Sequence, residues 1–243
     1  MRRVSSPTSS SRSGRTAGPH LRRAWGLVWA AIELSPELPP YYAGPGHLGP
    51  AHPMLADPEA RLPHILPRPK PEGPVIPTAR GDVAVWSGLH QQMETLLAEA
   101  VAEVRAAEPL VPERCRTTFG AEALPLRWLW HVARTQANFY ESCALHGELL
   151  ALPADALSGE ERAAAQALYD RWLEVLLDER ANAEAALPVM QANVRLDFRD
   201  HSHMALPAGA DLIRAKLVAL DHDTNVYLPA LAEAYGLTAP RAP

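Results

Sequence analysis

The chain has 243 residues, and its 47% hydrophobic and 21% charged residues are ordinary for a globular protein that buries a sizeable core. Its net charge is −5, but residues 1–23 hold six arginines and no acid, which leaves 17 basic against 28 acidic residues in the remainder. An acidic body repels phosphate backbones, which excludes nucleic-acid binding as a working hypothesis. The longest apolar stretch, residues 24–32, is too short to cross a bilayer, so no membrane anchor is expected.

Residues 1–23 combine the six arginines with repeated serines. This composition predicts a disordered basic tail. It also fits a transit peptide, or a start codon placed inside a longer gene.

Residues 24–80 are expected to form a short helix followed by an irregular arm. Trp25, Val28, Trp29 and Ile32 recur at spacings of three and four, which predicts an amphipathic helix over residues 25–34 with these side chains on its apolar face. Of the 24 prolines in the chain, 13 lie within residues 36–77, a density that excludes helix and central strand there.

Residues 81–237 are expected to form a helical bundle domain. Apolar residues repeat at helical spacing in four long segments, and no strand pattern alternates with them. The fold class is therefore mainly α, a bundle of about four long helices. The predicted helices cover residues 83–107, 122–150, 158–190 and 210–235.

Several local signals set the ends of these helices. Ser158 and Glu161 have the spacing of a capping box, and Gly236 is the expected C-terminal cap of the last helix. Pro125 is tolerable in a first turn, whereas Pro188 predicts a kink or break near residues 185–187 and Pro229 a kink.

Two groups of residues are candidates for binding. Tyr41 and Tyr42, with His47 and His52, lie in the proline- and glycine-rich arm, where aromatic rings on a stiff loop suit sugars or apolar ligands. The alternative is that these side chains anchor the arm to the bundle.

The densest polar cluster is Asp197-Phe-Arg-Asp-His-Ser-His203. His201 and His203, with Asp197, are weak metal-ligand candidates, and the alternative is that these residues cap and link two helices.

Nothing in the sequence has the arrangement of a complete catalytic site. Glu179 and Glu184 are expected on a solvated helix face, and Cys143 in the core. Cys115 and Cys143 form no CxxC pair, so we expect a reducing, cytoplasmic compartment. No phosphate-binding loop or dinucleotide fingerprint occurs, so no cofactor is expected.

Three stretches together resemble the C-terminal region of large bacterial glycoside-hydrolase-like proteins, in which a helical domain follows a hexosaminidase- or glucuronidase-like barrel. The first runs from Ala24-Trp25 through Pro36-Glu-Leu-Pro-Pro-Tyr-Tyr-Ala-Gly-Pro-Gly-His-Leu-Gly-Pro-Ala-His-Pro53. The second is Arg134-Thr-Gln-Ala-Asn138, and the third is Glu179-Arg-Ala-Asn-Ala183 with Leu187-Pro188 and Arg195-Leu196.

The resemblance implies that the catalytic barrel lies outside this chain, and that the chain is a non-catalytic domain or fragment whose partner is carbohydrate or that barrel. Two other functions stay open. One is a stand-alone interaction module that forms a homo-oligomer. The other is a small metal-dependent enzyme that uses His201 and His203.

Overall fold

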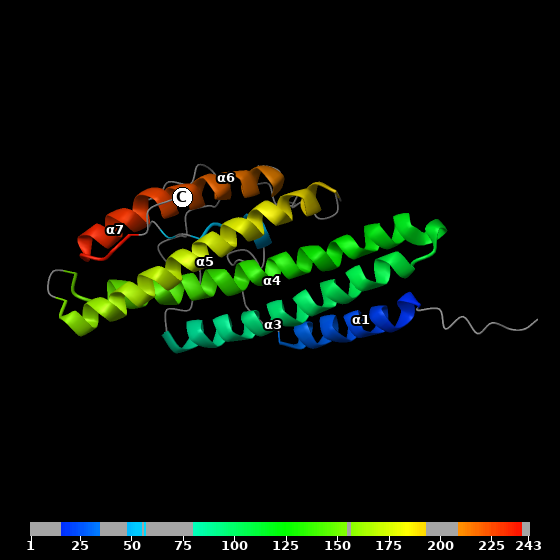
Figure 1. Ribbon diagram of the computed structural model, residues 1–243, viewed down its shortest axis with the longest axis horizontal. Coiled ribbons are helices and arrows are strands. Elements are labelled where there is room, and N and C mark those ends of the chain that lie inside the picture. Colours follow the sequence, from blue (N-terminus) through cyan, green and yellow to red (C-terminus); the bar gives the residue numbers. More distant parts are fainter. Residues whose placement is uncertain are drawn as a thin grey trace, which may run out of the picture.

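The computed structural model describes residues 16–34, 48–54, 56, 80–154, 157–192 and 209–239. These residues form long helices that lie side by side in chain order (Figure 1). The main contacts join α1 to α3, α3 to α4, α4 to α5, and α5 to α6. The predicted mainly α fold is confirmed, and α1 lies at one edge of the stack with α6 and α7 at the other.

Helix α1 spans Ala17–Glu33, so the boundary predicted at residue 23 lies inside a helix. Its buried residues are Ala24, Val28 and Ala31, whereas Trp25, Trp29 and Ile32 are at least half exposed. The predicted apolar face is therefore wrong except at Val28. Arg23 and His20 form ion pairs with α3, and the small alanines let the two helices approach closely, so this rotation of α1 is fixed by its contact with α3.

Helices α3 and α4 span Arg80–Ala107 and Arg116–Leu150. The end predicted for α3 is confirmed. Helix α4 begins six residues before the predicted start, which places Pro125 in its interior. Ala123 is buried against α1 and α3 and Phe119 packs beside it, so tertiary contacts stabilise the turns that precede the proline.

Helix α5 spans Gly159–Gln191, and the predicted capping box is confirmed: the Ser158 side chain accepts from the Glu161 backbone, and Glu161 accepts from the Ser158 backbone. The break predicted near Pro188 is absent, because the helix continues to Gln191. Pro188 lies in the last turn, and Met190 beyond it is buried against α6, so packing outweighs the one lost hydrogen bond.

The last predicted helix consists of α6 (Gly209–His222), a π-helical turn (Asp223–Tyr227) and α7 (Leu228–Ala234). The wider turn ends just before Pro229, whose missing N–H is tolerated in the first turn of α7. Gly236 has φ of 62°, and the Leu237 N–H donates to the Ala232 carbonyl, which confirms the predicted glycine cap.

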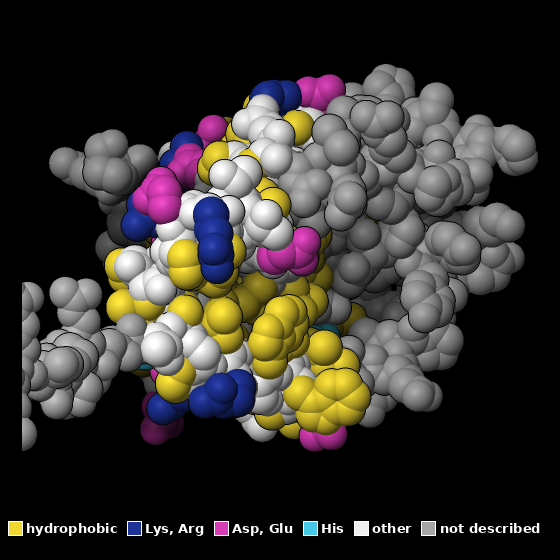
Figure 2. Space-filling model, turned by 90° about the vertical axis from the view of Figure 1, so that its right-hand side faces the viewer, with side chains coloured by type: hydrophobic (Ala, Val, Ile, Leu, Met, Phe, Trp, Pro, Cys, Tyr) yellow, Lys and Arg dark blue, Asp and Glu magenta, His cyan; other side chains and the backbone are white. Residues whose placement is uncertain are grey.

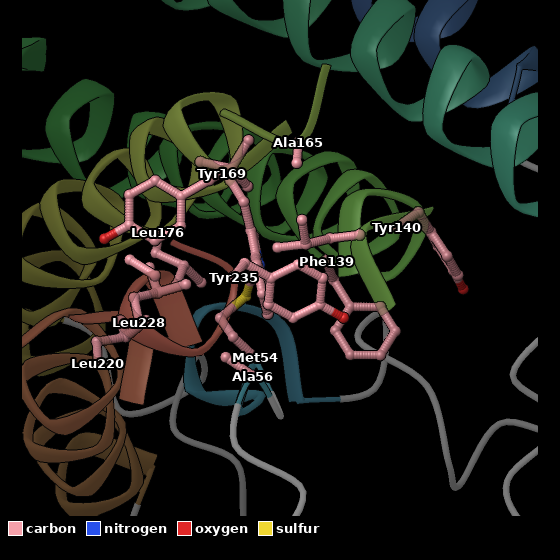
Figure 3. Packing of buried hydrophobic residues seen from close by; sticks show 14 of the residues in the cluster. Met54, Ala56, Phe139, Tyr140, Ala165, Tyr169, Leu176, Leu220, Leu228 and Tyr235 are labelled. Atoms are coloured by element: carbon pink, nitrogen blue, oxygen red, sulfur yellow. The ribbon is translucent and has the colours of Figure 1, made fainter. Parts of the chain in front are cut away.

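The largest core cluster lies where α4 and α5 meet α6 and α7 (Figure 3). Tyr169, Leu176, Leu220 and Leu228 contribute from the helices, and Met54 and Ala56 belong to the same cluster although they precede α3 in the chain. A part of the proline-rich arm therefore completes the core of the bundle.

Among the described residues, no helix is both long and apolar enough to cross a membrane.

Candidate functional site

A buried polar network joins α4, α5 and α6. Its side chains come from one face of each helix, where helical spacing would lead one to expect apolar residues. Glu179 and Lys216 have no exposed surface, and His131 is only 3% exposed. The network consists of His131, Thr135 and Asn138 on α4, Glu179 and Asn182 on α5, and Lys216 on α6.

The Glu179 carboxylate is the centre of this network. Its Oε1 accepts hydrogen bonds from Thr135 Oγ1 at 2.7 Å and from Lys216 Nζ. Its Oε2 accepts from Asn138 Nδ2 at 2.8 Å and from Asn182 Nδ2 at 3.4 Å. Two oxygens with four donors use the acceptor capacity of a carboxylate, so no lone pair of Glu179 remains to abstract a proton from a substrate.

Asn182 links Glu179 to His131. The His131 ring donates from Nδ1 to Asn182 Oδ1 at 2.8 Å, and Asn182 Nδ2 donates to the His131 carbonyl at 3.1 Å. Burial lowers the pKa of His131, although its bond to Asn182 opposes this shift. Burial likewise lowers the pKa of Lys216, against the attraction of Glu179. Both groups are thus held in positions where their charged forms are disfavoured by desolvation.

A second ion pair lies at the edge of the network. Arg134 binds Asp178 through two parallel hydrogen bonds, one of them from Nε to Oδ2 at 2.9 Å, and Asn138 Nδ2 donates to the same Oδ2. Burial raises the pKa of Asp178, but the bonds from Arg134 and Asn138 outweigh burial and lower it overall. Arg134 also lies over the Trp130 ring, 5.8 Å from its centre.

Beside this pair, α3, α4 and α5 form an open polar groove of about 630 Å³. Its charged side chains are joined to one another: Arg171 Nε donates to Glu141 Oε1 at 2.6 Å, and Gln91 Nε2 donates to Glu141 Oε2 at 3.1 Å. The groove meets the buried network at Asn138, which belongs to both.

The sequence-derived candidates lie elsewhere or outside the described residues. His52 is 2% exposed and its ring packs edge-on against Phe139, with centroids 4.7 Å apart, which places it in the core. Tyr41, Tyr42 and His47, and likewise Asp197, His201 and His203, are not among the described residues. Within the described ranges, no group of three or more potential ligands could hold a metal ion.

The solvated helix face expected for Glu179 and Glu184 is wrong for Glu179, which is fully buried, and holds for Glu184, which forms an exposed pair with Arg180. A signal for Glu179 was present, because it lies three and four residues after Leu176 and Val175 on the buried stripe of α5. Lys216 likewise interrupts the apolar series of Ile213 and Leu220. Cys143 packs against the core as expected, and burial raises its pKa to about 12.

The stack and its network define the class of this protein: it is a helical bundle in which a buried, hydrogen-bonded ion pair joins α5 to α6. No family model, curated protein or solved structure matches this chain.

Proposed function

We propose that this chain is a non-catalytic helical domain that works with a carbohydrate-active, glycoside-hydrolase-like enzyme. The observation that carries this proposal is where the stretches of the resemblance lie. Thr135 and Asn138 from one stretch, and Glu179 and Asn182 from another, are hydrogen-bonded to each other although about 40 residues separate them in the chain. The shared pattern therefore corresponds to residues that determine how α4 packs against α5.

The first stretch supports the same proposal. Its segment Gly49–Ala51 forms a short 3-10 turn that contacts α4, α5 and α6, the three helices of the network. Gly49 has φ of 52°, and a Cβ there would lie 2.8 Å from Val132 Cγ2. Both the positive φ and the lack of space for a Cβ require glycine at this position. This part of the pattern is therefore also explained by folding rather than by a catalytic or binding role.

The chemistry of the groove agrees with a domain that does not hydrolyse glycosides. Glycoside hydrolysis needs one carboxyl group with a raised pKa and a second that is free to act as a base or nucleophile. Glu179 has no free lone pair, Asp178 is held ionised by Arg134, and Glu141 is bound by Arg171 and Gln91. In this proposal the chain supports a partner that carries the catalytic acids.

The test has two parts. The purified chain is assayed on a panel of aryl glycosides, where we expect no turnover above the blank; turnover that Glu184→Gln or Asp178→Asn abolishes would refute the proposal. Co-expression with any barrel-encoding reading frame beside its gene is then expected to give a complex that co-purifies, and separate elution of the two proteins would also count against it.

A stand-alone interaction module is the second candidate, and one observation favours it. The α1 tryptophans Trp25 and Trp29 are 62% and 66% exposed, which is unusual for side chains of this size.

A further inference from the structure

Helix α1 presents an exposed face on the side opposite its contact with α3. At about 100° per residue, the residues of this face fall within roughly 120° of the helix circumference. All of them are exposed: Arg22, Trp25, Gly26, Trp29, Ile32 and Glu33.

Two observations place this face on the outside of the molecule. Ala24, Val28 and Ala31 already fill the contact with α3, and α1 lies at the edge of the helical stack (Figure 1). Figure 2, which looks at the stack from one end, shows hydrophobic side chains reaching the surface in its lower part, at the level of α1. Trp25, Trp29 and Ile32 thus form an apolar ridge that α3 does not use.

From this face we infer that α1 pairs with α1 of a second copy of the chain, antiparallel and about a two-fold axis. In such a pair, residues whose numbers have a constant sum lie opposite each other, because each contact occurs twice by symmetry. The pairing is isologous, so one surface must complement itself in both shape and charge.

The shape of the exposed α1 face and the charges on it both favour the same alignment of the two α1 helices. A Cβ built on Gly26 meets nothing within 4 Å, so Gly26 leaves an open notch on the exposed face. If Trp29 of the second copy fills this notch, Arg22 lies opposite Glu33 of the second copy, because both pairs of numbers sum to 55. The notch receives the large ring, and the single basic residue of the face meets its single acidic residue.

The indole N–H of Trp29 would not oppose burial of the ring in the dimer interface. Its indole Nε1 donates to Glu33 Oε1 at 2.8 Å within the same helix, so no donor is left unsatisfied when the ring is covered. The other oxygen of Glu33 can accept from Arg22 of the second copy. Among the described residues, Arg22 has no ion pair and Glu33 accepts only from the indole N–H, so no charged partner in that part of the chain would have to be displaced first.

A single helix pair buries less surface than a standard stable interface, so the dimer is expected to be weak, with a dissociation constant in the micromolar range. Sedimentation velocity of the full chain over a concentration series should show a monomer–dimer equilibrium. A chain that stays monomeric at the highest concentration would overturn the inference.

Substitutions on the face test the register. A Cβ at Gly26 meets open space, so Gly26→Leu places a side chain in the notch. We expect the dissociation constant of the dimer to rise at least about tenfold, since each contact occurs twice. Gly120→Leu, at another exposed helical glycine with open space around it, is the matched control and should leave dimerisation unchanged. A dimer that tolerates Gly26→Leu would place the interface elsewhere.

Charge reversal separates self-pairing from any other occupant. Arg22→Glu and Glu33→Arg should each weaken the dimer several-fold. The double variant should recover part of this loss, because it restores the charge pair between copies but not the acceptor of the Trp29 indole. A double variant that dimerises no more tightly than either single variant would refute this register. Circular dichroism of each variant confirms that it is folded, and the glycoside assay is independent of these results, so the two proposals fail separately.

Discussion

Two layers of the molecule depart in opposite ways from the usual rule that apolar side chains are buried and charged ones exposed. One is the polar layer, formed by α4, α5 and α6, and the other is the α1–α3 layer. In the first, Glu179 and Lys216 are fully buried; in the second, Trp25 and Trp29 are exposed while Ala24 and Ala31 are buried. The polar layer gains a specific alignment, because hydrogen-bonded groups must meet their partners. The α1–α3 layer gains close approach, because the small side chains of α1 lie in one cluster with the larger Met93, Leu97 and Val101 of α3. Burial in this protein therefore follows complementarity between helices rather than the hydrophobicity of each residue.

The largest effect should come from breaking the ion pair of the polar layer. Lys216→Met leaves the Glu179 carboxylate buried without its cation, and we expect the free energy of unfolding to fall by about 3–5 kcal/mol. Urea denaturation measures this change. Arg214→Met, an exposed position two residues away on α6, is the control and should change stability by less than about 0.5 kcal/mol. Equal effects of the two substitutions would show that the buried pair has no special role.

The pH dependence of stability should report the buried histidines, of which His131 belongs to the polar network. Burial lowers the pKa of His131, and also of His90 and His146, below the ordinary value of 6.5. Near and below pH 6.5, the folded protein then binds fewer protons than the unfolded chain. The protein therefore has its full stability above the histidine pKa of the unfolded chain, and it loses stability as the pH falls below that pKa. Each of these histidines is therefore expected to lower the free energy of unfolding as the pH falls below about 6.5.

His131→Gln isolates one of these groups, because an amide can still donate to Asn182 but does not titrate. The free energy of unfolding of this variant should fall less steeply below about pH 6.5. The difference in slope corresponds to up to one proton fewer taken up on unfolding. A slope identical to that of the unsubstituted chain would mean that His131 takes up its proton equally in both states.

Overpacking the α1–α3 contact should have a smaller effect. Ala31 is completely buried, so Ala31→Leu forces the helices apart and is expected to cost roughly 1–2 kcal/mol, in the lower part of the usual range because α1 is an edge helix that can shift. Thermal or urea denaturation detects this loss. Unchanged or higher stability would indicate a void beside Ala31 and would weaken the argument from close approach.

The smallest effect is expected from removing a much larger side chain on the same helix. Trp29→Ala deletes a ring that is 66% exposed, and the stability of the monomer should change by no more than about 0.5 kcal/mol. Measured at low protein concentration, this result contrasts with the loss for Ala31→Leu. A loss of several kcal/mol would show that Trp29 belongs to the core of the monomer after all.

The sequence determined that long helices form and where several of them end, because these features depend on local interactions. The starts of α1 and α4 differ from the prediction. Ser158 and Glu161 cap α5 within a single turn, and Gly236 ends α7 because its backbone adopts a conformation that glycine favours. The tertiary structure decided which faces are buried. The stripe of α1 could have packed through Trp25, Trp29 and Ile32. The fit of Ala24, Val28 and Ala31 against α3, together with the ion pairs from Arg23 to Glu99 and Glu103, selects the alanine face instead. The burial of Glu179 depends in the same way on Lys216, 37 residues later, since a carboxylate is buried only where distant residues supply its donors.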